Sequence, residues 1–195
     1  YIGGIILFDE TIRQKTSSGL SVPELIVKNG SIPGIKVDKG AKVLSGSPEE
    51  TVTEGLDGLR ERLKEYYELG ARFTKWRAVY KIGNKFPSSQ SIKSNAHALA
   101  RYAALVQEAK MVPIVEPEVL MDGDHSAEAC FNKTSEVIQK CFDELLLHKV
   151  DLSGIILKPN MILAGNQSKD KISSKEVSEK TLECLKNSVP SDVPG

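Results

Sequence analysis

The sequence shows no excess of charge of either sign, because 26 lysine and arginine residues balance 26 aspartate and glutamate residues. Binding to nucleic acid or to an anionic membrane surface depends on a clear excess of basic side chains. No apolar run is long enough to cross a bilayer, and Tyr1–Phe8 is an apolar segment with no basic stretch or cleavage site before it. We therefore expect no nucleic-acid partner, no transmembrane helix and no secretory signal.

Cysteine is scarce as well. The three cysteines are Cys130, Cys141 and Cys184, and they form neither a CxxC pair nor the spacing of a zinc site. An odd number without such spacing is typical of free thiols, which act as small hydrophobic residues in a reducing compartment. The cysteine content therefore predicts a cytoplasmic protein.

Histidine is also sparse. His97, His125 and His148 fall in helix or loop contexts away from the expected strand ends, so we interpret them as structural or exposed. No set of histidine and acidic residues has metal-ligand spacing, and Asp122-Gly123-Asp124 is more typical of a turn than of a cation loop. No glycine-rich phosphate-binding fingerprint follows a strand. We therefore expect neither a metal nor a cofactor.

The 195 residues suffice for one domain with a hydrophobic core, and strand-like segments alternate with helical ones. Strands are expected at Tyr1–Phe8, Ile32–Val37, Ala71–Ile82, Val112–Val115 and Gly154–Lys158. Helices are expected at Gly55–Leu69 after a Thr53 cap, from a Ser94 or Asn95 cap to about Lys110, from a Ser126 cap to about Lys149, and from a Ser173 or Ser174 cap to about Asn187. Residues 41–50 are expected to form a polar loop.

The strand ends recur at a nearly constant spacing. They lie near Lys36, Lys75, Glu116 and Lys158, which are 39, 41 and 42 residues apart. Strands that alternate with helices at this period predict an α/β fold of parallel βαβ units, a (β/α)8 TIM barrel. A doubly wound open sheet is the weaker alternative, because the phosphate fingerprint is missing. Since such a barrel usually needs about 250 residues, we expect residues 1–195 to form a single, incomplete barrel domain of about five βα units.

Four strand ends each carry two polar residues at positions i and i+2. The pairs are Lys36 and Asp38, Lys75 and Arg77, Glu116 and Glu118, and Lys158 and Asn160. Side chains two apart in a strand point to the same face, and the carboxyl ends of barrel strands form the mouth of the active site. A solvated strand end is the ordinary explanation for any one lysine, but four repeats of the pattern favour a site.

The lysines in this group point to amine chemistry. Lys158 follows the apolar run Ile155–Leu157, and Pro159 ends the strand after it. Clustered cations lower one another's proton affinity, so we expect one lysine to be a free amine that condenses with a carbonyl. Nearby carboxylates would move protons, and the other cations would hold anionic substrate groups such as phosphates. Spacing alone does not choose among Lys36, Lys75 and Lys158.

Two features of these strand ends have competing interpretations. Glu116-Pro117-Glu118 is either an acid pair on the rim or a catalytic pair. Trp76 lies between Lys75 and Arg77 and therefore points to the opposite face, where we expect it to pack against helices.

Six segments together resemble class I fructose-1,6-bisphosphate aldolases. They are GIKVDKG (34–40), TEGLDGL (53–59), FTKWRAV (73–79), VPIVEPEVL (112–120), DGDH (122–125) and LKPNM (157–161). The resemblance covers essentially the whole chain in order. It implies a (β/α)8 barrel and the glycolytic, reversible cleavage of fructose 1,6-bisphosphate into dihydroxyacetone phosphate and glyceraldehyde 3-phosphate. It also implies a cytoplasmic homo-oligomer, a tetramer in the full-length form.

The resemblance assigns roles to the residues at the strand ends. It implies that Lys158 is the lysine that forms a Schiff base with the substrate. Glu116 resembles the acid and base that transfers protons around the carbinolamine, and Glu118 would support it and help to set the charge around Lys158. Lys75 would lie beside the reactive amine and increase its reactivity.

The resemblance also implies a binding role for three further side chains. Lys36 resembles a lysine that contacts the substrate, and Arg77 resembles a residue that contacts substrate phosphate or hydroxyl groups. Asp38 is expected to pair with these cations in the same mouth.

By the same resemblance, the chain carries the second to the sixth strand of the barrel. The first strand would supply an aspartate for proton abstraction, and the seventh and eighth a Ser-Gly-Gly segment and an arginine that bind substrate phosphate. Five strands alone would leave two unpaired edges. The alternatives to an active aldolase are a catalytically incomplete remnant that binds or scaffolds and, less well supported, a transaldolase-like Schiff-base enzyme.

Overall fold

The computed structural model describes residues 2–195. Its strands are β1 (Gly4–Leu7), β2 (Ile32–Lys36), β3 (Ala41–Leu44), β4 (Ser47–Thr53), β5 (Phe73–Tyr80), β6 (Val112–Val119) and β7 (Ile156–Leu157). Its helices are α1 (Asp9–Ile12), α2 (Val22–Lys28), α3 (Leu59–Glu68), α4 (Ser89–Glu108), α5 (Ala127–Leu147), the 3-10 turn η1 (Leu152–Gly154) and α6 (Ser174–Ser188). In this part of the chain, no helix combines the length and apolar character needed to span a bilayer.

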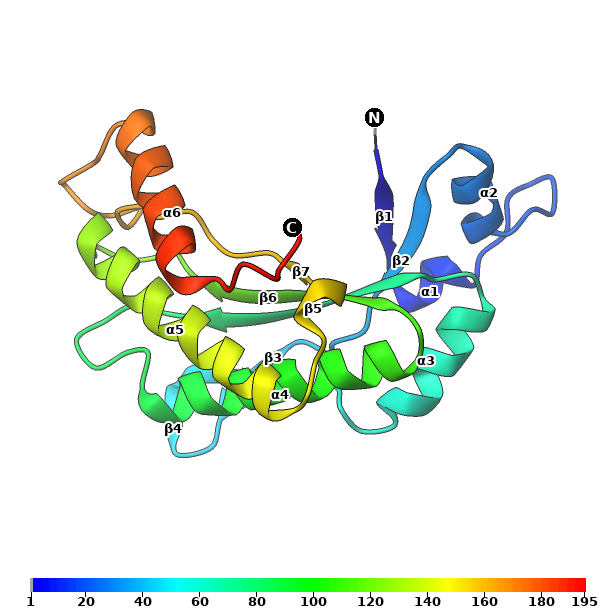
Figure 1. Ribbon diagram of the computed structural model, residues 1–195, viewed down its shortest axis with the longest axis horizontal. Coiled ribbons are helices and arrows are strands. Elements are labelled where there is room, and N and C mark those ends of the chain that lie inside the picture. Colours follow the sequence, from blue (N-terminus) through cyan, green and yellow to red (C-terminus); the bar gives the residue numbers. More distant parts are fainter. Residues whose placement is uncertain (1) are drawn as a thin grey trace.

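Five strands form one parallel sheet in the order β1-β2-β5-β6-β7, and β3 and β4 form a separate antiparallel hairpin. Each sheet strand lies next to the one that follows it along the chain, whereas a doubly wound sheet reverses its order at a switch point. Helices α3, α4 and α5 lie along one side of the sheet (Figure 1). This is the topology of a sector of a (β/α)8 barrel, which confirms the predicted fold class.

The register of the sheet brings the polar strand ends to one edge. Lys36 pairs with Lys75 between β2 and β5, and Arg77 pairs with Glu116 between β5 and β6. Beyond the end of β7, the backbone N–H of Lys158 donates to the carbonyl of Val115 at 2.9 Å. Because the strands are parallel, four carboxyl ends that are far apart in sequence become neighbours.

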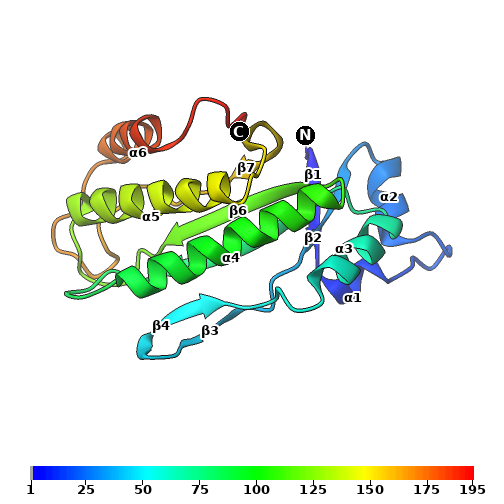
Figure 2. The same cartoon turned by 60° about the horizontal axis from the view of Figure 1, so that its bottom comes forward.

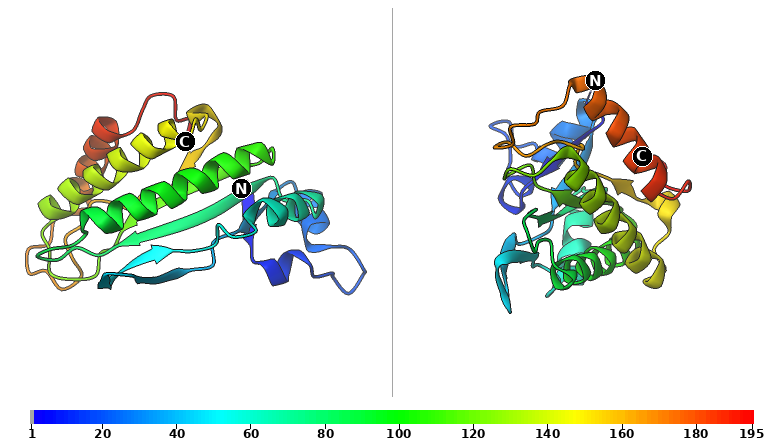
Figure 3. Two further views of the ribbon diagram at one scale, coloured as in Figure 1. Left: turned by 90° about the horizontal axis from the view of Figure 1, so that it is seen from below. Right: turned by 90° about the vertical axis from the view of Figure 1, so that its left-hand side faces the viewer.

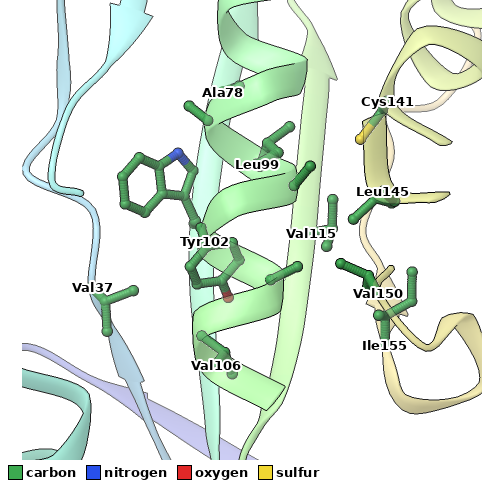
Figure 4. Packing of buried hydrophobic residues seen from close by; sticks show 14 of the residues in the cluster. Val37, Ala78, Leu99, Tyr102, Val106, Val115, Cys141, Leu145, Val150 and Ile155 are labelled. Carbon is green, nitrogen blue, oxygen red and sulfur yellow. The ribbon is translucent and has the colours of Figure 1, made fainter. Parts of the chain in front are cut away.

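The core lies between the sheet and the long helices. Alternate residues of β5 are buried, among them Trp76, whose ring lies 5.3 Å from that of Tyr102 on α4. The expected packing of Trp76 against a helix is therefore confirmed. Figure 4 shows Tyr102 and Leu99 of α4 packed over the strands, with Leu145 of the neighbouring α5 next to Val115. Figure 3 shows α4 and α5 side by side along the sheet.

Two sequence-based boundaries near the start of α3 were wrong. Residues 41–50 form most of the hairpin β3–β4 instead of a polar loop, and Thr53 ends β4 instead of capping a helix. Helix α3 begins at Leu59, after Gly58 in a left-handed conformation with φ 62°. The hairpin buries little apolar surface, so its sequence lacks the alternation that marks a strand. Figure 2 shows it beside α4.

The predicted start of α4 was also wrong. Ser88 caps α4, so Ser94 and Asn95 lie inside the helix. Asn95 is fully buried, and its side chain accepts from the Thr53 N–H at 3.0 Å and donates to the Thr51 carbonyl at 2.8 Å. Asn95 thus joins the hairpin to α4. This tertiary contact explains why an asparagine, which the local sequence suggests as a helix cap, lies inside the helix.

Strand β6 continues past its predicted end at Val115 in spite of Pro117. The backbone N–H groups of Val112 and Leu120 donate toward β5. The N–H groups of the odd-numbered residues of β6 therefore point toward β7. Pro117 therefore needs no N–H donor, because the pairing with β7 ends at Val115. The fifth predicted strand is shorter than expected, since η1 replaces its start.

Other boundaries agree with the sequence-based predictions. Ser126 caps α5 and Ser173 caps α6, each with a side chain that accepts from the backbone three residues later. Gly70 follows α3 with φ 109°, as expected for a glycine beyond a helix end.

We predict that Asn95→Ala lowers the free energy of unfolding by about 1–3 kcal/mol, because it leaves a buried donor and a buried acceptor of the hairpin unpaired. Gln90→Ala is the matched control, since Gln90 also donates to the hairpin, at Ser45, but at an exposed position. Urea unfolding monitored by circular dichroism measures both. Equal losses for the two variants would contradict a special role for Asn95.

Candidate functional site

Seven of the eight polar strand-end residues form four ion pairs at the carboxyl edge of the sheet, and these fall into three groups because Glu116 takes part in two of them. Lys36 pairs with Asp38, both Lys75 and Lys158 pair with Glu116, and Arg77 pairs with Glu118. The eighth, Asn160, holds the loop after β7 in place. The structure thus gathers every site residue predicted from the sequence at the predicted edge.

Glu116 lies at the centre of these contacts. Its side chain is only 3% exposed. Its Oε1 accepts a hydrogen bond from Nζ of Lys158 at 2.6 Å, and its Oε2 lies 2.7 Å from Nζ of Lys75. The contact with Lys75 is an ion pair without hydrogen-bond geometry, since Oε2 has no hydrogen-bond partner. One buried carboxylate therefore bridges two amino groups from different strands.

The two lysines differ in their access to solvent. The side chain of Lys75 is 16% exposed, whereas that of Lys158 is 57% exposed. An ammonium that is largely buried needs a fixed counter-charge, and Glu116 supplies it. Lys158 is the amine that a dissolved molecule can reach.

Asp38 forms the second centre of charge, with a side chain that is 2% exposed. Its Oδ1 accepts from Nζ of Lys36 at 2.5 Å and from the N–H of Gly40 at 3.0 Å. Its Oδ2 accepts from the backbone N–H of Arg77 at 3.4 Å. The predicted pairing of Asp38 with a cation is therefore present, and it fixes the end of β2 against β5.

Arg77 and Glu118 form the third pairing, between neighbouring strands. The hydrogen bond to the Glu118 carboxylate raises the pKa of the Arg77 guanidinium above its ordinary value, so this side chain stays charged. A hollow of about 340 Å³ opens beside the pair and is bordered by Pro159 and Asn160. The observed partner of Glu118 is thus Arg77 and not Lys158.

Asn160 joins three segments around this hollow. Its Oδ1 accepts from the N–H of Val119 at 2.9 Å, and its Nδ2 donates to Oγ1 of Thr134 on α5 at 3.0 Å. The amide therefore ties the loop after β7 to β6 and to α5. This anchoring fixes the path of the chain immediately after Lys158.

Two supporting residues were not predicted from the sequence. Arg62 on α3 donates to the carbonyls of Val37 and Gly55, and thereby holds the loop that follows β2. Thr53 donates from Oγ1 to the carbonyl of Arg77 at 2.8 Å. Both belong to elements whose boundaries were mispredicted. Gly55 has a positive φ, and a Cβ atom added to it would lie 2.9 Å from the backbone nitrogen of Lys39. This glycine therefore marks the place where the two backbone segments approach each other closely.

Cys130 borders the same hollow as Arg77 and Asn160, with its Sγ 3.8 Å from Nδ2 of Asn160. All three cysteines are free and buried, and burial raises the pKa of the Cys141 thiol to about 12. His125 is buried, and desolvation lowers its pKa. His97 and His148 meet Glu144 at the surface between α4 and α5, and the fold brings His97 to Glu144 across 47 residues of sequence.

We predict that the two lysines around Glu116 compensate for each other. Lys75→Met and Lys158→Met should each change the free energy of unfolding by no more than about 1 kcal/mol, because the remaining lysine still pairs with Glu116. The double variant should lose about 3–5 kcal/mol, because it leaves a buried carboxylate unpaired. Urea unfolding of the four proteins at pH 7 measures this coupling. Additive effects would contradict the shared pairing.

Comparison with known proteins gives a consistent answer. The sequence profile of the family described as "Fructose-bisphosphate aldolase class-I" matches residues 1–195. A probable fructose-bisphosphate aldolase class 1 of Xanthomonas campestris pathovar campestris is 56% identical over 195 residues, which are 100% of this chain and 58% of that protein. The cytosolic fructose-bisphosphate aldolase 4 of Arabidopsis thaliana is 50% identical over 194 residues, which are 100% of this chain and 49% of that protein.

A solved structure shares the fold. The fructose-bisphosphate aldolase of Plasmodium falciparum, crystallised in complex with TRAP and a small-molecule inhibitor, aligns with a TM-score of 0.97 at 45% identity, over 100% of this chain and 56% of that one. The chain thus spans about half the length of the relatives it matches. The profile match and the shared barrel sector show that this chain belongs to the class I fructose-bisphosphate aldolase family.

Proposed function

We infer that the complete protein is a Schiff-base aldolase that cleaves fructose 1,6-bisphosphate reversibly into dihydroxyacetone phosphate and glyceraldehyde 3-phosphate, and that Lys158 is its nucleophile. The observation that carries this proposal is the sharing of Glu116 between a buried Lys75 and an accessible Lys158. Membership of the aldolase family supports the reaction and the substrate.

Access and position favour Lys158 as the nucleophile. Glu116 pairs with both lysines, and the less exposed Lys75 has the greater need of its negative charge. Lys158 is more exposed than Lys75, and its Nζ lies 2.6 Å from Oε1 of Glu116. Its amine can therefore meet a dissolved carbonyl compound next to a carboxylate that can exchange protons with it.

The trio can then perform the first steps of the reaction. The Lys158 amine adds to the carbonyl carbon of the ketose, and proton transfers give a neutral carbinolamine. Glu116, within hydrogen-bond reach of Nζ, takes up a proton from solvent and passes it to the hydroxyl group, which leaves as water. When a base removes the hydroxyl proton of the departing aldehyde and the carbon–carbon bond breaks, the iminium accepts the electron pair of that bond.

The remaining strand-end residues fit the binding of an anionic sugar. Arg77 offers guanidinium N–H groups beside the hollow, and Lys36 supplies a second cation in the same mouth. Asp38 and Glu118 hold these cations in position before substrate arrives. A phosphate group would exchange these pairings for its own, which accounts for paired cations in a site without substrate.

The proposal also covers the domain that carries the site and the cellular location of the protein. We propose that residues 1–195 form one domain, supported by a single continuous hydrophobic cluster, and that segments outside them close the barrel. Exposed Ile5, Ile6 and Ile156 on the two terminal strands support such closure. A cytoplasmic location accords with the three free cysteines and with the cytosolic relatives, and the tetramer stays a prediction.

Trapping of the Schiff base tests the proposal. The purified chain is incubated with dihydroxyacetone phosphate, reduced with borohydride, and digested for mass spectrometry. We expect a single reduced adduct on Lys158, because its amine is both accessible and next to the proton donor Glu116. Lys158→Met should abolish the adduct without transferring it to Lys36 or Lys75.

A matched control uses Lys175, which lies on α6, pairs with Glu179 and is 84% exposed. Lys175→Met should leave trapping unchanged, and Glu116→Gln should reduce it at least tenfold, since general acid–base catalysis contributes about 10²- to 10⁴-fold. No adduct on a folded chain, or equal labelling of exposed lysines, would contradict the assignment of Lys158 and favour a binding protein.

A further inference from the structure

A second group of chemically active side chains lies outside the strand-end site, on the surface between α4 and α5. We call it the His97–Glu144–His148 cluster. His97 comes from α4, and Glu144 and His148 come from the end of α5. Each residue offers one possible metal-ligand atom, and the three atoms all lie within 4.8 Å of one another. The two imidazole rings are in edge-to-face contact, with centroids 4.9 Å apart.

We propose that the His97–Glu144–His148 cluster binds a divalent transition-metal ion, Zn²⁺ above all, which joins α4 to α5. Two imidazoles and one carboxylate form a ligand set that zinc uses, with water in the fourth position. Donor atoms at about 2.0–2.1 Å from a tetrahedral zinc ion lie roughly 3.3 Å apart. Nδ1 of His97 and Oε2 of Glu144 are already 3.1 Å apart, which is close to that separation.

The end of α5 prepares two of the ligands. Glu144 and His148 are four residues apart, so they lie on the same face of the helix. Nδ1 of His148 lies 2.9 Å from the backbone carbonyl of Glu144 and donates its N–H to that oxygen. This hydrogen bond fixes the tautomer and leaves Nε2 as a free ligand atom, an arrangement that is common for metal-bound histidines.

The cluster is partly shielded from solvent but is still accessible from it. The side chains of Glu144 and His148 are 14% and 22% exposed, whereas that of His97 is 51% exposed and leaves room for a water ligand. The one close competing cation among residues 2–195 is Lys140, whose Nζ lies 3.9 Å from Oε1 of Glu144. Lys140 also lies 3.4 Å from Asp143, so it has an alternative partner when a metal takes Glu144.

A bound ion would stabilise the packing of α4 on α5. These helices meet along the core that supports β5 and β6. The cluster itself lies at their surface, where the side chain of His97 is 51% exposed. Binding to the folded state alone raises the stability in proportion to the logarithm of metal concentration. The role assigned to the metal is therefore structural and separate from the chemistry at Lys158.

Zinc titration of the untagged chain after removal of metals with a chelator tests this proposal. Calorimetry should show one Zn²⁺ per chain, and the midpoint of thermal unfolding should rise with added Zn²⁺ but not with Mg²⁺, which prefers oxygen ligands. His97→Gln and His148→Gln should each weaken zinc binding by more than the roughly 10- to 100-fold that loss of an outer-shell partner costs.

Two further variants test whether zinc binds at these three residues. Lys140→Gln should strengthen zinc binding, because it removes the competing cation. Glu136→Gln, a surface carboxylate on α5 that pairs with Lys133, should leave it unchanged. Unaltered zinc affinity in both histidine variants would overturn the proposal and assign the metal to the cysteine thiols. Absence of one-to-one binding by the parent chain would overturn it as well.

Discussion

The buried carboxylate of Glu116 is the constraint around which the carboxyl edge of the sheet is arranged. A charge that is 3% exposed must be neutralised at short range, and it receives two amino groups from strands on either side. The sheet register makes this possible, because Arg77 pairs with Glu116 in the ladder and Lys158 bonds to Val115. The position of the amine therefore follows from parallel strand pairing.

The other charged residues of the edge are held by similar means. Asp38 is fixed by Lys36 and two backbone N–H groups, and Glu118 is fixed by Arg77. Each acid thus holds a cation in a fixed position. Asn160 and Arg62 then fix the loops between which these pairs lie. The site is a set of local pairings supported by rigid strand ends.

Sequence alone was sufficient for the features that depend on local patterns. The 39- to 42-residue period predicted the barrel sector, and the i and i+2 pairs predicted which side chains gather at the carboxyl edge of the sheet. Sequence analysis failed where tertiary contacts determine the structure. The hairpin is held by Asn95, which the local sequence pattern predicted to be a helix cap. Pairings between strands, such as Arg77 with Glu118, and the His97–Glu144–His148 cluster also depend on distances that no spacing encodes.

The relative chemical reactivity of the lysines tests the central claim most directly. Trace acylation at pH 7, followed by mass spectrometry, compares Lys158 with Lys175, which is more exposed but lies outside the site. The shared counter-charge predicts that Lys158 reacts faster than Lys175, and that this advantage disappears in Lys75→Met, which leaves Glu116 to pair with Lys158 alone. Slower reaction of Lys158, or an advantage that survives in Lys75→Met, would contradict the account.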